Sequence, residues 1–135
     1  MGSTPAGVAR GLTLLLVDDN APMRALIRSL IQDIAPVIHE CENGQSAVAA
    51  YPLLHPDWVV MDIELDGMDG IAATRAIRQL DSRARVIMVT GHGTEQYRRA
   101  ATDAGASAFV LKDDLLELPA VLATLLQSEA DERAP

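Results

Sequence analysis

Trp58-Val59-Val60-Met61-Asp62 is the stretch that decides the fold, because four apolar residues run directly into a carboxylate. A continuous apolar run of this length is typical of a strand that is buried on both faces of a parallel sheet. A charged residue at its end contributes little to stability, but open α/β sheets build their binding sites at the carboxyl ends of strands. The stretch therefore predicts a central strand that carries a functional carboxylate, Asp62, at its end.

Three other apolar runs also end in polar residues that can take part in chemistry. They are Leu12–Val17 followed by Asp18 and Asp19, Val86–Val89 followed by Thr90, and Ala108–Leu111 followed by Lys112. The carboxyl ends of parallel strands meet at one edge of a sheet. Because carboxylates, a hydroxyl and an ammonium group would gather there, we expect one site that binds a divalent cation and a phosphoryl group.

Helical patterns alternate with these strands. Apolar residues recur with helical spacing from Met23 behind the capping residue Asn20, and we expect this helix to end at Ala35, before a proline. Further elements are expected over 37–40, 43–51 (ended by Pro52), 57–62, 69–80, 85–90, 94–104, 107–111 and from 119 onward. Five strands alternating with five helices predict an α/β fold with a doubly wound parallel sheet.

Length and composition indicate one folded domain. The chain has 135 residues, of which 49% are hydrophobic, and we expect the domain to span residues 12–127 between flexible segments at 1–11 and 128–135. The formal net charge of -8 and the absence of a basic cluster argue against direct nucleic-acid binding. No apolar run approaches the roughly 18 residues of a membrane helix, and no signal peptide is recognisable. We therefore expect a cytoplasmic protein without membrane contact.

The order of the polar groups resembles the receiver domain of two-component response regulators. The matching residues are Asp18, Asp19, Asp62, Thr90 and Lys112, together with Asp69-Gly70 and the stretch Ala104–Phe109. The resemblance covers roughly residues 12–127 and implies a flavodoxin-like sheet with the strand order 2-1-3-4-5.

The resemblance also implies a reaction and a metal. A sensor histidine kinase or a histidine phosphotransfer protein would donate a phosphoryl group to Asp62 with the help of Mg²⁺, for which Mn²⁺ can substitute. The implied metal site consists of Asp19, Asp62, the backbone carbonyl of Glu64, and Asp18 acting through water. Three carboxylates this close repel one another without a cation, which agrees with a metal site.

Further roles follow from the family pattern. Thr90 and Lys112 would bind the phosphoryl group. Thr90 and Phe109 would form the switch pair, although Phe109 could equally be a core residue. Glu64 and His92 lie where the family varies the lifetime of the phosphoryl group, with a solvated loop histidine as the alternative for His92.

The output of such a domain is a change of its interaction surface. The family pattern implies a surface formed by the fourth helix, the fifth strand and the fifth helix, which would contact a downstream protein or a fused output domain. The chain would then be a stand-alone regulator or the receiver part of a longer protein. It would be a regulatory domain and not an enzyme, apart from its own phosphorylation and dephosphorylation.

Two other classes use related architectures. A haloacid-dehalogenase-like Mg²⁺-dependent phosphatase also has a strand-end aspartate nucleophile, but it requires a second aspartate two residues later, where this chain has Glu64. A flavodoxin-like electron carrier needs aromatic residues around its cofactor, and this chain has one Trp, two Tyr and one Phe. The receiver domain is therefore the better interpretation.

Overall fold

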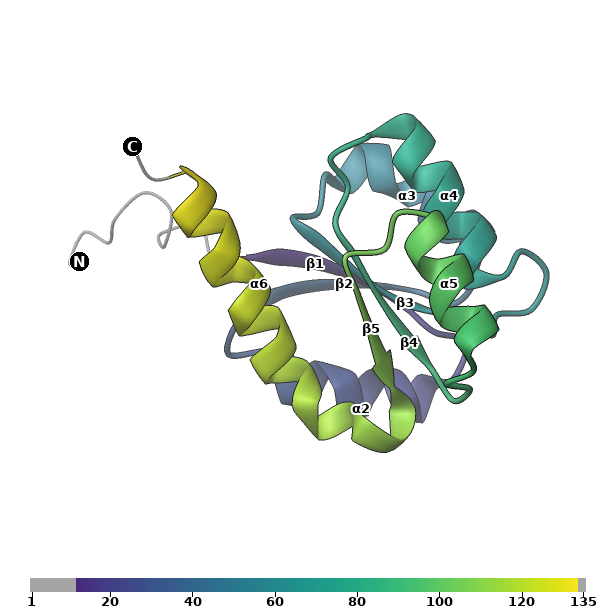
Figure 1. The fold of residues 1–135 in the computed structure, drawn as a ribbon, viewed down its shortest axis with the longest axis horizontal. Helices are drawn as coiled ribbons and strands as arrows, with labels where there is room; N and C mark the ends of the chain where they lie inside the picture. The colour runs from purple at the N-terminus through teal and green to yellow at the C-terminus, as the bar shows by residue number, and fades with distance from the viewer. Residues whose placement is uncertain (1–11, 134–135) are drawn as a thin grey trace.

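The computed structural model describes residues 12–133, and the side chains of residues 12–129. Five parallel strands form one sheet in the order β2-β1-β3-β4-β5 (Figure 1). The strands are β1 (Thr13–Val17), β2 (Val37–Cys41), β3 (Trp58–Asp62), β4 (Val86–Thr90) and β5 (Ala108–Leu111). The predicted strand order is confirmed, and β3 is the central strand that its sequence predicts.

Five α-helices cover the sheet on both faces within the described residues, which confirms the doubly wound fold. They are α2 (Ala21–Ile31), α3 (Gly44–Leu54), α4 (Gly70–Leu80), α5 (Glu95–Asp103) and α6 (Leu118–Arg133), with a 3₁₀ segment, η1 (Lys112–Glu117), before α6. Helices α3, α4 and α5 lie on one face, and α2 and α6 lie on the other (Figure 1).

Successive residues of each strand enter opposite cores, because side chains alternate across a sheet. Trp58 and Val60 of β3 pack with α2 and α6, whereas Val59 and Met61 pack with α3 and α4. All of them are fully buried, as expected for a strand covered on both faces.

Four helices begin directly after a residue whose side chain caps the helix. Each capping residue lies in the loop that follows the carboxyl end of a strand. In each case the cap accepts a hydrogen bond from the backbone N–H three residues later, which satisfies a donor that the helix leaves free. The pairs are Asn20 with Met23, Asn43 with Ser46, Asp69 with Ala72, and Thr94 with Tyr97. These caps set where each helix starts and therefore which backbone groups face the carboxyl edge of the sheet.

Two helix ends differ from the sequence prediction. Helix α2 ends at Ile31 and not at Ala35, because the chain turns there, with the N–H groups of Ile34 and Ala35 both bonded to the Ile31 carbonyl. Helix α3 continues through Pro52 to Leu54. A proline this close to a helix end removes only one late hydrogen bond.

Residues 128–133, expected as part of a flexible tail, continue helix α6 in the structure. The segment is rich in helix-forming Ala, Glu and Arg residues. Glu129 also forms an ion pair with Arg85, just before β4, which ties this part of α6 to the sheet. The predicted flexible segment 1–11 and residues 134–135 lie outside the described part of the chain. Among residues 12–133, no helix combines the length and apolar character required to cross a membrane.

Candidate functional site

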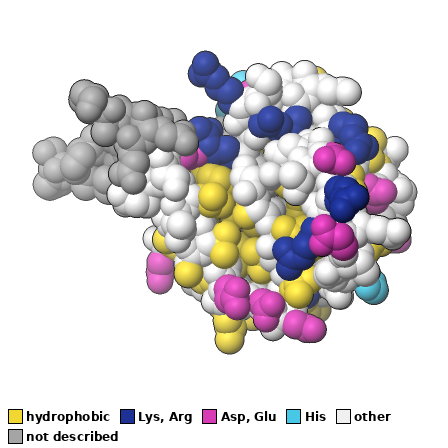
Figure 2. All heavy atoms as spheres, viewed as in Figure 1, with side chains coloured by type: hydrophobic (Ala, Val, Ile, Leu, Met, Phe, Trp, Pro, Cys, Tyr) yellow, Lys and Arg dark blue, Asp and Glu magenta, His cyan; other side chains and the backbone are white. Residues whose placement is uncertain are grey.

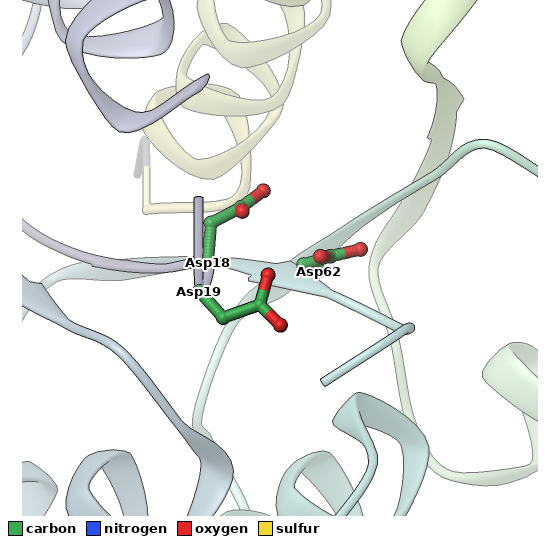
Figure 3. A group of neighbouring side chains, drawn as sticks. All are labelled: Asp18, Asp19 and Asp62. Carbon is green, nitrogen blue, oxygen red and sulfur yellow. The ribbon is translucent and has the colours of Figure 1, made fainter. Parts of the chain in front are cut away.

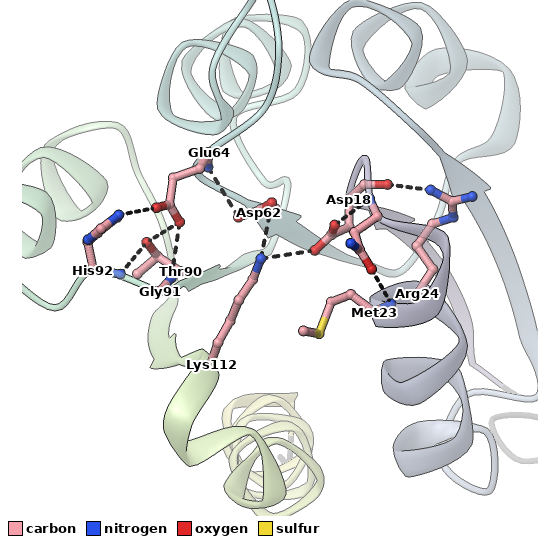
Figure 4. Close-up of polar contacts among 10 residues, drawn as sticks. Asp18, Met23, Arg24, Asp62, Glu64, Thr90, Gly91, His92 and Lys112 are labelled. Carbon is pink, nitrogen blue, oxygen red and sulfur yellow. Dashed lines mark hydrogen bonds and ion pairs between the residues drawn. The ribbon is translucent and has the colours of Figure 1, made fainter.

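The carboxyl edge of the sheet collects the polar residues that the sequence predicts. Asp18 and Asp19 follow β1, Asp62 ends β3, Thr90 ends β4 and Lys112 follows β5. Because these strands are parallel and adjacent, the residues come from distant parts of the chain and meet at one place (Figures 3 and 4). The structure therefore brings the whole predicted set together.

Three carboxylates form the centre of the site (Figure 3). One oxygen each from Asp18, Asp19 and Asp62 lies within 4.8 Å of the others. Asp18 and Asp62 are 1% and 2% exposed, whereas Asp19 is exposed. Oxygen-rich clusters with an open side are what Mg²⁺ requires, since it keeps several of its waters.

The surroundings of one atom, Asp18 Oδ2, indicate whether a cation fits the cluster. Asp18 Oδ1 accepts a 2.8 Å hydrogen bond from the N–H of Asn20. Asp18 Oδ2 is buried and has no hydrogen-bond partner among the described residues. Lys112 Nζ lies 3.5 Å from this oxygen and is shared with Asp62. A buried carboxylate oxygen that accepts no hydrogen bond is costly, and a bound cation would relieve that cost. The residues present therefore fit a divalent metal.

Lys112 is the cation that the chain itself supplies. Its Nζ lies 3.4 Å from Asp62 Oδ2 and 3.5 Å from Asp18 Oδ2 (Figure 4). Burial lowers the pKa of Lys112, but the charges of Asp62 and Asp18 outweigh burial and hold the pKa above its ordinary value. Lys112 is therefore a fixed positive charge beside the Asp62 carboxylate.

The protonation of Asp62 reflects its crowded surroundings. Burial and the neighbouring charge of Asp18 raise the pKa of Asp62 to about 6, although Lys112 and the N–H of Glu64 act in the opposite direction. The N–H of Glu64 donates to Asp62 Oδ1 at 3.1 Å. A carboxylate with a raised pKa gains most from a bound cation, because the cation favours its charged form.

Arg24 on α2 contacts the backbone that carries the acidic pair. Its Nη1 donates a 2.6 Å hydrogen bond to the carbonyl of Asp18, and its Nε lies 2.7 Å from Glu40 Oε1 on β2 (Figure 4 shows the first contact). Sequence reasoning missed this residue. Nothing in the local pattern indicates that an arginine on the first helix turns back toward the site, because Glu40, which orients it, lies on another strand.

Gly70 at the start of α4 packs directly against the strand end that carries Asp62. A Cβ at this position would overlap the carbonyl oxygen of Asp62. The Gly70 N–H donates a 2.8 Å hydrogen bond to the Ile63 carbonyl. The glycine thus lets α4 approach the backbone of the site. Gly70 belongs to the family pattern, but no local signal in the sequence indicates this contact.

Glu64 lies between the end of β3 and the end of β4. Glu64 Oε1 accepts hydrogen bonds from the Thr90 hydroxyl at 2.9 Å and from the Gly91 N–H at 3.0 Å. His92 Nε2 lies 2.7 Å from the other oxygen, Oε2 (Figure 4). Burial would raise the pKa of Glu64, but the Gly91 N–H, the Thr90 hydroxyl and His92 outweigh it and hold the pKa below its ordinary value.

Phe109 and Thr90 lie on the same face of the sheet. Phe109 is opposite Met88 in the register of β4 and β5, and it packs in the same core as Met88, two residues before Thr90. Phe109 is only half-buried, and the guanidinium carbon of Arg98 on α5 lies 4.6 Å from the centre of its ring. A half-buried ring beneath a surface arginine differs from an ordinary core phenylalanine.

Comparison with known proteins identifies the family. A family model for the response regulator receiver domain matches residues 14–123. The chain belongs to the response regulator receiver domain family. It is a domain of two-component signalling, and this family is a regulatory phosphoacceptor family. Receiver domains bind Mg²⁺ at an acidic pocket, and Asp18, Asp19 and Asp62 form such a pocket here.

Three similar proteins illustrate the match. The chemotaxis protein CheY of Halobacterium salinarum is 40% identical over 99 residues, which is 73% of this chain and 82% of that protein. The chemotaxis protein CheY of Bacillus subtilis is 42% identical over 100 residues, 73% of this chain and 83% of that protein. The crystal structure of a LuxR-family two-component response regulator from Aurantimonas sp. SI85-9A1 has a TM-score of 0.82 and 36% identity, covering 87% of this chain and 86% of that one.

These matches bear on the competing interpretations. None of the three supports a haloacid-dehalogenase-like phosphatase. The receiver interpretation of the sequence is therefore confirmed at the level of the family.

Proposed function

We propose that Asp62 accepts a phosphoryl group from a phosphohistidine of a sensor kinase or of a phosphotransfer protein. The observation that supports this most is that Asp62 is 2% exposed and lies between two further aspartates and Lys112 at the edge of the sheet. A buried carboxylate in such surroundings is costly for stability, and groups of this kind cluster at functional sites.

The proposed reaction is a transfer between two side chains. A carboxylate oxygen of Asp62 forms a bond to phosphorus while the bond between phosphorus and the donor histidine nitrogen breaks, and the electron pair of that bond stays on the imidazole. The product is an acyl phosphate on Asp62. Such transfers depend mainly on positioning and on neutralising charge, and they require little covalent chemistry from the protein.

The acidic pocket would hold the metal through Asp19, Asp62 and the backbone carbonyl of Glu64, with Asp18 acting through water. When bound, Mg²⁺ supplies positive charge that offsets both the carboxylates and the phosphoryl oxygens. Lys112, 3.4 Å from Asp62 Oδ2, would pair with a phosphoryl oxygen on the opposite side. Mn²⁺ prefers similar oxygen ligands, so we expect it to substitute.

The switch would connect the phosphoryl group to the surface. Thr90 would donate its hydroxyl to a phosphoryl oxygen, and Phe109 would move inward as Thr90 moves. The fourth helix, fifth strand and fifth helix of the family pattern correspond to α5, β5 and α6. Figure 2 presents this side, with basic and acidic side chains over α5 and hydrophobic side chains emerging beside α6. A separate protein or a fused output domain would bind here, and the net charge of -8 disfavours nucleic acid as the direct partner.

Phosphorylation by acetyl phosphate tests the proposal. Intact-mass spectrometry should detect one added phosphoryl group on the wild-type protein with Mg²⁺ or Mn²⁺ and none with EDTA. Asp62→Asn should keep its fold and lose the label, because an amide cannot form the acyl phosphate. Asp69→Asn is a matched control, since asparagine also caps a helix, and it should be labelled normally. Undiminished labelling of Asp62→Asn would disprove the assignment.

A further inference from the structure

The Glu64 carboxylate contacts three polar groups at the end of β4 and in the loop that follows it. Its Oε1 accepts from the Thr90 hydroxyl and from the Gly91 N–H, and its Oε2 lies 2.7 Å from His92 Nε2 (Figure 4). Two donors and the His92 imidazole converge on one carboxylate, which is the kind of arrangement that proteins use to bind an anion.

The Thr90 hydroxyl cannot donate a second hydrogen bond in this arrangement. The residue is 0% exposed, and its oxygen accepts a hydrogen bond from the His92 N–H at 3.0 Å. A hydroxyl carries a single proton, and here that proton is donated to Glu64 Oε1. A phosphoryl group on Asp62 can therefore bond to Thr90 only after Glu64 has released it.

The position of Glu64 in the chain makes this competition direct. Glu64 lies two residues after Asp62, and its N–H is bonded to Asp62 Oδ1 at 3.1 Å. The backbone of Glu64 is thus held beside the phosphoryl acceptor, and its side chain spans from there to β4. A phosphoryl group on Asp62 would introduce further negative charge next to a carboxylate that already fills the donors.

We propose that the Glu64 carboxylate is a built-in substitute for the phosphoryl group, which holds Thr90 and Gly91 in the resting arrangement. The inference rests on the proposed phosphorylation of Asp62. Phosphorylation would expel the Glu64 side chain, and only then would Thr90 turn to the phosphoryl group. Glu64 is in this sense a positioning residue that acts through Thr90.

The route by which Glu64 would leave is open. Its side chain is 33% exposed, and the His92 side chain, which contacts it from outside, is 62% exposed. A rotation of the Glu64 side chain toward solvent would release Thr90 and Gly91 without moving the backbone. His92 would remain available to the expelled carboxylate, because both side chains face the solvent.

Beryllofluoride with Mg²⁺ is a suitable probe, because it mimics a phosphoryl group on aspartate without requiring a donor. We expect Glu64→Ala to bind beryllofluoride about tenfold more tightly than the wild-type protein, which corresponds to the loss of one charge-assisted competing hydrogen bond. Glu64→Gln keeps the volume and one acceptor oxygen, and it should show a smaller gain. Glu95→Ala removes a negative charge from the start of α5 and serves as the control, with no expected gain.

A double-mutant cycle separates competition for Thr90 from simple charge repulsion. In a Thr90→Val background the hydroxyl is absent, so the gain from Glu64→Ala should become clearly smaller. A gain of equal size in both backgrounds would overturn the proposal, because repulsion does not depend on the hydroxyl. Unchanged beryllofluoride affinity in Glu64→Ala would overturn it as well.

Two further measurements distinguish a failure of the Glu64 proposal from a failure of the proposed phosphorylation of Asp62. Amide hydrogen exchange at Gly91, measured without metal or beryllofluoride, should be faster in Glu64→Ala because its acceptor is lost, and an unchanged rate would contradict the resting contact. If beryllofluoride binds Asp62→Asn as well as it binds the wild-type protein, the proposed phosphorylation site is wrong. That result differs from a failure of the Glu64 proposal, which would leave the Asp62 dependence intact.

Discussion

Arg24 holds the backbone of Asp18 through a 2.6 Å hydrogen bond from Nη1 to the Asp18 carbonyl. Glu40 orients the guanidinium from the other side, at 2.7 Å from Nε. The side chain of Arg24 is only 14% exposed, so this contact is shielded from solvent. The acidic pair is therefore held by a residue that contacts neither its carboxylates nor, as we propose, the metal.

Arg24→Gln should weaken Mg²⁺ binding by about tenfold, because a charge-assisted hydrogen bond that positions Asp18 and Asp19 is lost. Isothermal titration of Mg²⁺ measures the effect directly. Arg28→Gln is the matched control, because Arg28 binds the same Glu40 carboxylate but donates its other hydrogen bond to Ile38. Equal Mg²⁺ affinities for the two variants would show that Arg24 is only part of the surface ion-pair network.

Asp62→Asn should stabilise the metal-free protein at pH 7. The pKa of Asp62 is raised to about 6 in the folded protein, whereas an unfolded aspartate has a pKa of about 3.9. The folded state therefore binds the proton more tightly, and its stability falls as the pH rises from about 4 to about 6 and stays low above that. The gain from the substitution is at most about 3 kcal/mol at pH 7 and should vanish near pH 4.

Thermal unfolding in EDTA at several pH values checks this expectation, with Asp103→Asn on the exposed surface of α5 as the control. Saturating Mg²⁺ should remove most of the difference, since a cation favours the charged form of the wild-type carboxylate. A difference in Tm between Asp62→Asn and wild type that is the same at pH 4 and pH 7 would contradict the raised pKa.

Gly70→Ala should lower both the stability and the affinity for Mg²⁺. The added Cβ would overlap the backbone carbonyl of Asp62, so α4 or the end of β3 must shift. Overpacking of this kind typically costs roughly 1–3 kcal/mol. Gly91→Ala offers a control for stability, because its Cβ would meet Glu64 Oε1 at an ordinary contact distance of 3.8 Å. Calorimetry of the three proteins would show the predicted contrast, and a wild-type Tm for Gly70→Ala would refute it.

Arg98→Gln should make the switch easier to operate. The guanidinium lies 4.6 Å from the centre of the Phe109 ring and favours the ring's half-exposed position. If Phe109 leaves this position on activation, the exposed cation–π contact opposes that movement. Its loss should therefore make beryllofluoride bind about two- to fivefold more tightly. Arg99→Gln is the neighbouring control, because Arg99 contacts Glu95 on the same helix. Equal beryllofluoride affinities for the two variants would show that the stacking does not oppose the switch.

The fold was predictable because its signals are local. Each strand is a short apolar run, and each of four helices begins at a capping side chain that bonds three residues ahead. The predictions failed at helix ends, because α2 stops where the chain turns at Ile31 and α3 continues past Pro52. The continuation of α6 past Gln127 is accompanied by the ion pair of Glu129 with Arg85, a residue just before β4 that lies far from Glu129 in the sequence.

The sequence by itself determined the sheet, the family and the residues at the strand ends. Parallel strands bring their carboxyl ends to one edge of the sheet, whichever strands are adjacent. Only the tertiary structure decided what those residues contact. No periodic or spacing signal in the chain indicates the hydrogen bond of Glu64 with Thr90 or that of Arg24 with the Asp18 carbonyl. The same is true of the packing of Gly70 against the Asp62 backbone. Each depends on distances between separate elements, which are set by how the helices pack on the sheet and not by any local preference of the residues themselves.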